Sequence, residues 1–325
     1  MTQGKVLVTG ASGFLGRRTV EILSERGFSV RALVRKTSKI DNLKRPEVEI
    51  SFGDVSDIST LKPYFEGIDF VVHTAADTTG TKEGALRVTI GGTRNILDLC
   101  TKFPVQKLVY ISSLSVYGLA DCKDGQIIDE NAPLERYPER RGVYSWSKIE
   151  AEKLVRDRMK KGTIPVVCLR PGTIYDPGGK LFTPMMGFSL GTKLFVTIGP
   201  VDLVLPLVYI DNLIDAILLT IQKRESIGKT YNVVDQKNPT KKRYVDFLLR
   251  KLYPKAKFVY IPYALVAVIT SGQEMVMRSA RRPPIMTRYR LISSQKKIRY
   301  DSSWLRLSMG WESSYSFEKV VQAVQ

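Results

Sequence analysis

Short apolar runs rich in β-branched residues alternate with helical patterns along the first half of the chain. Strands buried on both faces are nearly continuous apolar runs, and such strands separated by helices are typical of a parallel sheet covered on both sides. The alternation therefore predicts an α/β fold with a doubly wound parallel sheet. The runs are VLVTG at 6–10, VRALV at 30–34, Val48–Phe52, FVVH at 70–73, LVYIS at 108–112 and VVCLR at 166–170.

The segment TGASGFLG, residues 9–16, lies where the first expected strand meets its helix, which the spacing predicts over Phe14 to Arg26. Its glycines permit a tight turn, let the backbone approach a pyrophosphate and allow close helix packing, while the helix N-terminus offers free N–H groups. With a strand before it and a helix after it, the pattern predicts a dinucleotide site rather than a merely structural turn. The predicted binding residues are Gly10, Ser12, Gly13, Phe14, Leu15 and Gly16.

The residues after the second expected strand distinguish NAD from NADP. NAD binders usually have an acid about 20 residues beyond the glycines to bond the ribose 2′-hydroxyl. Here Val34 is followed by Arg35 and Lys36. A guanidinium suits bidentate contact with a 2′-phosphate, so the sequence favours NADP(H), with NAD(H) left open and solvated loop charges as the alternative interpretation. After the third expected strand, Asp54 and Val55 are predicted to contact the cofactor, although Asp54 also suits a turn.

Composition and net charge limit which kinds of partner the protein is expected to bind. The 325 residues carry a net charge of +18, which predicts attraction to a phosphorylated cofactor, an anionic substrate or an acidic membrane, or else a generally basic surface. No basic platform interleaved with aromatic residues is present, so we expect no nucleic acid.

Cys100, Cys122 and Cys168 lack CxxC spacing, which argues against a zinc site or disulfides, and we expect no metal. No apolar run is long enough to span a bilayer, and the expected location is the cytoplasm, with peripheral membrane contact left open.

Two further segments bring groups suited to proton transfer. In YSWSK, Tyr144 and Lys148 are four residues apart and share one face of a helix. A nearby ammonium and an oxidised nicotinamide both favour the phenolate, so we expect a lowered pKa that allows Tyr144 to exchange a proton with substrate. The segment VYISSLSVYG, residues 109–118, ends the fifth expected strand, where ligands of such sheets collect. Its hydroxyls at Ser112, Ser113 and Ser115 each suit contact with a substrate oxygen or with backbone groups.

Together the segments resemble the extended short-chain dehydrogenase/reductase family, also called the NAD-dependent epimerase/dehydratase family. The resemblance extends to HTAAD at 73–77, RPGTIY at 170–175, LVYIDNLIDA at 207–216 and YNVVD at 231–235. It implies a Rossmann sheet with Tyr144 as acid/base, Lys148 as its electrostatic partner and Ser113 as the hydroxyl. Cofactor contacts are further implied for Ala75, Ala76, Tyr144, Lys148, Pro171, Gly172 and Ile174.

One departure is Thr89, which stands in VTIGGT where the family commonly has an asparagine. The single histidine, His73, is interpreted as a packing residue at a strand end. The resemblance also implies a homodimer formed through the helix that carries YSWSK.

The resemblance further implies two domains, a dinucleotide-binding domain at 1–175 plus 205–235 and a smaller C-terminal α/β substrate-binding cap at 176–204 plus 236–325. In the cap, IPYALVAVIT at 261–270 is expected either to face an apolar substrate or to form the core helix, and a basic stretch from Arg278 to Arg299 follows it. An apolar surface with basic residues beside it also suits anionic lipid.

The leading hypothesis is an NADP(H)-linked oxidoreductase acting on a hydroxyl or ketone of a hydrophobic or sugar-derived small molecule. The alternative is a nucleotide-sugar 4-epimerase or dehydratase with tightly bound NAD. Against a dehydratase, Leu114 and Ser115 stand where an acidic pair is wanted. A second alternative is a non-catalytic NADP sensor or a protein that binds anionic surfaces.

Overall fold

The central element of the computed structural model, which describes residues 3–179, 181–183, 185–282, 284 and 286–324, is a seven-stranded parallel sheet. Its order is β12-β7-β5-β4-β1-β2-β3, so the predicted doubly wound sheet is confirmed. Each of the six predicted runs forms a strand within one residue of its expected bounds. The strands are β1 (Lys5–Thr9), β2 (Ser29–Val34), β3 (Val48–Phe52), β4 (Phe70–His73), β5 (Lys107–Ile111), β7 (Val166–Pro171) and β12 (Thr230–Val233).

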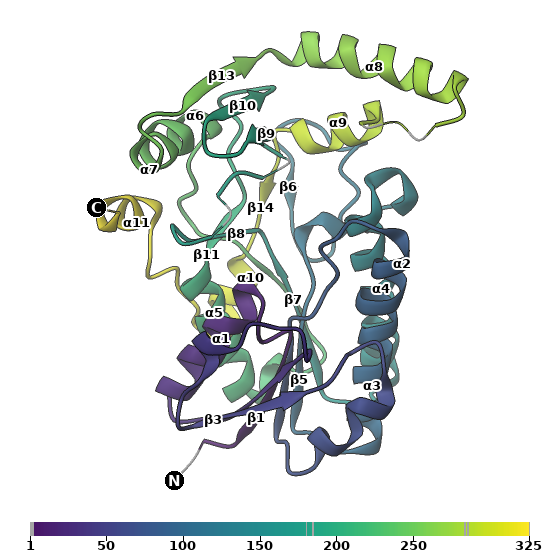
Figure 1. Ribbon diagram of the computed structural model, residues 1–325, viewed down its shortest axis with the longest axis vertical. Helices are drawn as coiled ribbons and strands as arrows, with labels where there is room; N and C mark the ends of the chain where they lie inside the picture. The colour runs from purple at the N-terminus through teal and green to yellow at the C-terminus, as the bar shows by residue number, and fades with distance from the viewer. Residues whose placement is uncertain (1–2, 180, 184, 283, 285, 325) are drawn as a thin grey trace.

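Alternate side chains of these strands enter two separate cores. Val6 and Val8 of β1 pack in the core that includes α1 (Phe14–Glu25) and α5 (Ile210–Gln222). Between them, Leu7 packs in the core that includes α3 (Gly92–Lys102) and α4 (Val143–Lys161). The two-residue period of a strand thus feeds both faces, which explains why the runs are apolar throughout. Figure 1 shows the two helix pairs on opposite sides of the sheet.

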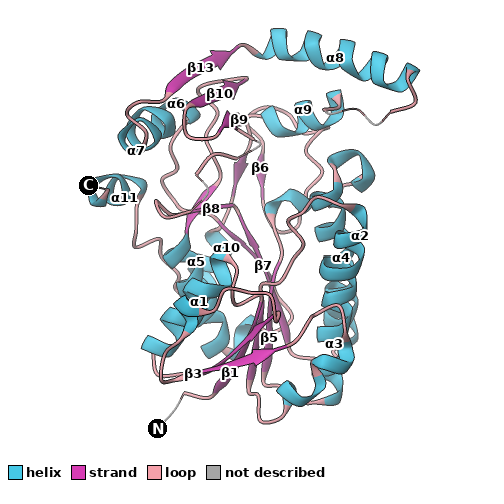
Figure 2. Ribbon diagram, viewed as in Figure 1, coloured by secondary structure: helices cyan, strands magenta, loops and turns pink. Residues whose placement is uncertain are grey.

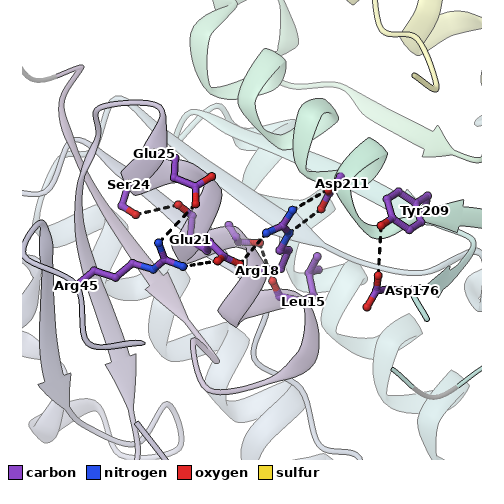
Figure 3. Close-up of polar contacts among 10 residues, drawn as sticks. Leu15, Arg18, Glu21, Ser24, Glu25, Arg45, Asp176, Tyr209 and Asp211 are labelled. Carbon is purple, nitrogen blue, oxygen red and sulfur yellow. Dashed lines mark hydrogen bonds and ion pairs between the residues drawn. The ribbon is translucent and has the colours of Figure 1, made fainter. Parts of the chain in front are cut away.

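The helix α1 ends close to the predicted residue, and ion pairs fix it to its neighbours. Gly27 follows it with a φ of +84°. Arg18 donates two hydrogen bonds of 2.8 Å to Asp211 in the first turn of α5 (Figure 3). It also pairs with Glu21, whose other oxygen pairs with Arg45 of the loop before β3. The Arg18 hydrogen bond holds the pKa of Glu21 below its usual value. These contacts tie the first crossover to α5.

A smaller sheet lies at the end of the molecule opposite the N-terminus (Figure 2). Its order is β13-β10-β9, and it packs with two helices. One face stacks Phe195 on Phe258 at 5.1 Å, while on the other Val196 and Ile198 contact Leu291. We call these five elements the cap: β9 (Gly187–Leu190), β10 (Leu194–Ile198), β13 (Lys257–Ile261), α8 (Tyr263–Ser279) and α9 (Arg288–Gln295).

The remaining elements connect the cap with the large sheet. Two short parallel pairs are β8 (Thr173–Tyr175) with β11 (Leu207–Tyr209), and β6 (Ile127–Ile128) with β14 (Arg299–Tyr300). The other helices are α2 (Lys82–Gly84), α6 (Lys241–Tyr244), α7 (Arg250–Leu252), α10 (Ser303–Met309) and α11 (Phe317–Ala323).

The apolar segment 261–270 differs from both expectations. It begins α8, in which Thr270 is the one buried residue, so it is not a core helix. Among the described residues, none of α8 lines the cleft described below, so the segment does not face a substrate there either. The prediction failed because apolar composition at helical spacing identifies a helix but not the surface that it meets.

Candidate functional site

A cleft of about 890 Å³ opens at the carboxyl end of the large sheet, between that sheet and the cap. This is where open α/β sheets bind their ligands. Lys36 is the one predicted site residue that does not line it; its side chain is exposed. The predicted residues that do line the cleft are Gly10, Ser12, Gly13, Phe14, Leu15, Gly16, Arg35, Asp54, Val55, Ala75, Ala76, Ser113, Tyr144, Lys148, Pro171, Gly172 and Ile174.

The turn between β1 and α1 has no room for side chains at its glycines. Gly10 has a φ of +68°, and a Cβ there would lie 2.8 Å from the backbone of Ala75. A Cβ on Gly16 would lie 2.2 Å from the carbonyl oxygen of Gly10. No side chain caps the start of α1, and no acid lies in its first turn. The free N–H groups of the helix and the close turn fit a pyrophosphate.

Beyond the turn, the cleft extends past the ends of β2 and β3. Arg35 is exposed on its wall. Asp54 also lines the wall, and one of its carboxylate oxygens accepts hydrogen bonds from the backbone N–H and the hydroxyl of Ser56 at 2.9 and 2.8 Å. Asp54 therefore makes the turn contacts that its alternative interpretation required, while it remains on the cleft surface.

The three serines after β5 occupy different environments, which the sequence alone left unresolved. Ser112 donates to the buried carboxylate of Glu152. The Ser113 hydroxyl lies near Tyr144 and lowers its pKa, and it accepts a hydrogen bond from the backbone N–H of Ser115. The Ser115 hydroxyl is buried beside the cleft without a hydrogen-bond partner among the described residues. Ser113 is thus the serine that contacts the tyrosine.

In the protein alone the pKa of Tyr144 is raised, whereas the lowered value expected from the sequence also requires an oxidised nicotinamide beside it. Although 45% of the residue is exposed, it is exposed within the cleft, and desolvation by the surrounding protein raises its pKa. The nearby Ser113 hydroxyl opposes this rise only in part. In the protein alone Tyr144 is therefore neutral at physiological pH.

Lys148 is buried one turn further along α4. Its ammonium donates to the carbonyl oxygen of Ile111 at 2.8 Å. Burial lowers its pKa from 10.5 to about 8. His73 is buried as well. Its own burial lowers its pKa to about 3, and the nearby charge of Lys148 lowers it further. His73 is hydrogen-bonded to Thr9 and Thr93 at 2.7 and 3.1 Å, as a neutral packing residue would be.

A buried ion pair behind this helix was not predicted. Glu152 follows Lys148 by one turn and pairs with Arg170 of β7, and both side chains are almost fully buried. Arg170 also donates to the hydroxyl of Tyr117 at 2.7 Å. The network fixes α4 against β5 and β7. Its sequence signal was the continuation of the Tyr144 and Lys148 spacing to position 152.

Thr89, at the position of the departure from the family pattern, has a defined contact. Its hydroxyl accepts a hydrogen bond of 2.8 Å from the backbone N–H of Asp77. This contact holds the loop after β4, which includes Ala75 and Ala76 on the cleft wall.

The cap side of the cleft was not predicted residue by residue, because its lining comes from scattered positions without periodicity. Gly142 begins α4 with a φ of +90°, and a Cβ there would lie 3.3 Å from the guanidinium of Arg290. Other residues on this side are Leu119, Thr183, Met185, Met286, Ser293, Ser294 and Tyr300.

A family model and individual known proteins both place the chain in one family. The model of the NAD dependent epimerase/dehydratase family matches residues 6–233. A 4-hydroxy-2-methyl-3-oxo-4-farnesyl-3,4-dihydroquinoline-1-oxide ketoreductase of Stigmatella aurantiaca is 26% identical over 327 residues, which cover 99% of this chain and 96% of the relative. A 3 beta-hydroxysteroid dehydrogenase/Delta 5-->4-isomerase of Mycobacterium tuberculosis (strain ATCC 25618 / H37Rv) is 31% identical over 66% of this chain and 60% of its own length.

Solved structures share the fold. The crystal structure of gox2253 superposes with a TM-score of 0.80 at 25% identity, over 99% of this chain and 97% of that one. The UDP-glucose 4-epimerase of Thermus thermophilus, solved with NAD, has a TM-score of 0.73 at 19% identity, over 98% and 97%. The second likeness concerns the fold alone.

Proposed function

Because the chain belongs to the NAD dependent epimerase/dehydratase family and is thus an NAD(P)-dependent enzyme of the extended short-chain dehydrogenase type, we propose a specific activity within that family. The activity is NADP(H)-linked reduction of a ketone, or oxidation of the matching hydroxyl, on a hydrophobic or sugar-derived small molecule. The observation that carries the proposal is the place of Ser113, Tyr144 and Lys148 together in the cleft that also contains the β1–α1 turn.

Tyr144 is the proposed general acid for reduction. When bound, the nicotinamide supplies or accepts the hydride. A raised pKa keeps the phenol protonated, and the protonated form is the one that can donate to a developing alkoxide. Ser113 holds the same substrate oxygen, which fixes the geometry for proton transfer.

Lys148 is proposed to have two roles. Its ammonium, one helical turn from Tyr144, stabilises the phenolate that remains after proton donation. One of its three donors is used by the Ile111 carbonyl, which leaves others for a ribose hydroxyl. We expect Lys148→Ala to weaken both turnover and cofactor binding.

The β1–α1 turn is proposed to bind the pyrophosphate, and Arg35 the 2′-phosphate that distinguishes NADP from NAD. Support for Arg35 comes from its exposed place on the cleft wall and from the absence of an acid at Val34. Ala75, Ala76, Asp54 and Val55 complete the proposed adenosine side, and Pro171, Gly172 and Ile174 the nicotinamide side. Lys36 is not retained, because it points to solvent.

A hydrophobic substrate is favoured over a nucleotide sugar. The cleft lining includes the apolar side chains of Leu119, Met185 and Met286. The similar proteins include a ketoreductase for a farnesylated quinoline oxide and a hydroxysteroid dehydrogenase, both named for apolar ring compounds. The division into a dinucleotide domain at 1–175 plus 205–235 and a substrate cap in the remainder also belongs to the proposal, as does a homodimer through α4.

Calorimetric titration with NADPH and NADH tests the cofactor assignment, after native mass spectrometry has shown whether dinucleotide co-purifies. We expect the protein to be purified without bound dinucleotide and to bind NADPH at least about tenfold more tightly, which corresponds to about 1.4 kcal/mol. Tightly retained NAD would contradict the exchanging reductase and support the epimerase or dehydratase instead. Binding of NADPH without turnover of any ketone would support an NADP sensor.

A further inference from the structure

The helix α8 presents an apolar stripe to solvent. Five large apolar residues follow helical spacing along one side of it, and all are exposed. Val268 is 71% exposed and Met275 is 67% exposed. Positions three, four, seven, ten and eleven residues apart share one face of a helix, so these side chains form a continuous stripe. Its members are Leu265, Val268, Ile269, Met275 and Val276.

The orientation of α8 is the reverse of that of an ordinary surface helix, which buries its apolar stripe. The side of α8 that faces the cap contributes Val266 and Ala267, which pack beside Leu291 of α9. The larger apolar side faces outward. Figure 1 shows α8 along the outer edge of the cap, extending beyond α9 and away from the large sheet.

Further large apolar side chains are exposed on the small sheet of the cap. Val259 of β13 is 44% exposed and lies opposite Val196 of β10 in the parallel register. Paired residues share a face of the sheet, and Val196 packs on the side where α8 and α9 lie. Phe188 of β9, also opposite Val196, is 53% exposed. The stripe therefore does not stand alone.

The segment that contains this surface is strongly basic. Residues 255–299 contain ten lysines and arginines and a single acid, Glu274, which gives a net charge of +9, half of the +18 of the whole chain. Glu274 pairs with Arg278 and accepts from the backbone N–H of Arg288. Arg278, Arg281 and Arg282 are exposed where α8 ends.

The end of α8 keeps an arginine where glycine is usual. The backbone N–H of Arg281 bonds to the carbonyl of Arg278 and that of Arg282 to Met277, the pattern of a helix end closed by a left-handed residue. Arg281 is that residue, with a φ of +53°. Glycine adopts this conformation without strain, so the arginine is held there against backbone preference. Its position places a charge at the end of the stripe.

We infer that α8 is a docking surface for an anionic lipid bilayer. Its apolar stripe enters the boundary between headgroups and acyl chains, and the arginines at its end contact lipid phosphates. None of the helices that the structure describes is long and apolar enough to cross a membrane, so the contact is peripheral. The inference rests on the cap surface and is independent of the proposed function.

The positive charge of this surface favours an anionic membrane over the other partners that an apolar stripe could bind. A second copy that covered the stripe symmetrically would bring together two surfaces that each carry the exposed Arg278, Arg281 and Arg282. A bilayer of anionic lipid instead neutralises them. Nucleic acid is also disfavoured, because the exposed residues beside the arginines are aliphatic rather than aromatic.

Docking through α8 brings the cap wall of the cleft near the lipid. The helix α9 packs against α8 and contributes Ser293 and Ser294 to the cleft lining, and Met286, in the connection between the two helices, also lines it. A membrane-resident molecule would thus meet the cleft from its cap side.

Co-sedimentation of the full chain with vesicles tests the inference. Vesicles of equal parts phosphatidylcholine and phosphatidylglycerol should bind the protein, and Val268→Ser/Ile269→Ser should lower the partition coefficient about 100-fold. Leu307→Ser on α10, where Leu307 is 85% exposed and outside the cap, is the matched control and should bind as the parent does. Equal binding by Val268→Ser/Ile269→Ser and the parent would overturn the inference.

A second variant tests the charges without altering the stripe. Arg281→Ala/Arg282→Ala should weaken binding about 25-fold, and binding to pure phosphatidylcholine should be weaker by more than that. Equal binding to both vesicle types would overturn the choice of anionic lipid. A dimer in analytical ultracentrifugation that dissociates on Val268→Ser/Ile269→Ser, without vesicle binding, would assign the stripe to a second copy.

Discussion

The β1–α1 turn and the helix α8 show two opposite uses of glycine. At Gly16 an added Cβ would lie 2.2 Å from the Gly10 carbonyl, whereas at Gly272 in α8 nothing lies within 4 Å. The first glycine is required by contact between backbones, and the second stands in open space. Residue identity is therefore fixed by backbone contact at the β1–α1 turn, whereas this position of α8 tolerates substitution.

The largest expected effect concerns the proton donor on the nucleotide side. Tyr144→Phe should lower kcat by about 10²- to 10⁴-fold, because it removes the hydroxyl while the ring that lines the cleft remains. NADPH affinity, measured by calorimetry, should change little. Tyr137→Phe is the matched control, since Tyr137 is 46% exposed and does not line the cleft. Turnover like that of the parent in Tyr144→Phe would disprove the mechanism.

The two glycines provide the second test. Gly16→Ala should lower the free energy of unfolding by about 1–3 kcal/mol and weaken dinucleotide binding, because the turn and the helix must separate. Gly272→Ala should raise the free energy of unfolding by up to about 1 kcal/mol, because alanine is the better helix former and has space there. Urea denaturation measures both. A neutral Gly16→Ala would show that the turn can relax, and the contrast between the regions would fail.

Cofactor preference is the third test. Arg35→Ala should reduce the preference for NADPH over NADH by about tenfold, because the 2′-phosphate loses a charged partner. Lys36→Ala, which alters an exposed neighbour outside the cleft, should leave the preference unchanged. The ratio of the two dissociation constants is the measurement. An equal effect of both substitutions would reduce Arg35 to a general surface charge.

The smallest effect compares Lys148, which lines the cleft, with a second buried lysine that does not. Burial lowers the pKa of Lys148 in α4 and of Lys241 in α6 from 10.5 to about 8. Between pH 8 and 10 the unfolded chain binds more protons at these lysines than the folded protein does, so their contribution to the free energy of unfolding rises with pH. Denaturation across this range should show a smaller rise in Lys241→Met.

Only Lys148 should affect the pH dependence of activity. The value of kcat/KM should fall above about pH 8 in the parent as Lys148 loses its charge, because this constant reports the ionisations of the free enzyme. Lys241→Met should retain that descending limb, since Lys241 donates to Ile198 and Gln295 and does not line the cleft. A profile flat to pH 10 in the parent would exclude a role for the charge.

The predictability of each part follows from the physics that formed it. The strands could be predicted within one residue because burial on both faces leaves uninterrupted apolar runs, and the glycine turn because backbone contact admits no other residue. The choice among Ser112, Ser113 and Ser115 required the structure, because their separation depends on contacts with Glu152 and Tyr144 from a distant helix.

Two features that the sequence did not indicate have a common cause. The raised pKa of Tyr144 and the outward stripe of α8 both depend on what surrounds a residue in three dimensions. Spacing along the chain identified the Tyr144 and Lys148 face, but it contained no measure of desolvation. Composition likewise identified an apolar helix at 261–270 without indicating which side faces the cap.

The attachment of α4 to β5 has a consequence for how such enzymes diversify. Lys148 is hydrogen-bonded to Ile111 and Glu152 to Ser112, so two successive turns of the helix are attached to the last residue of β5 and to the residue after it. Neither contact involves a residue of the cap. Segments of the cap can therefore be exchanged or lengthened during evolution, and new substrates acquired, while the spacing between Ser113 and Tyr144 is inherited unchanged.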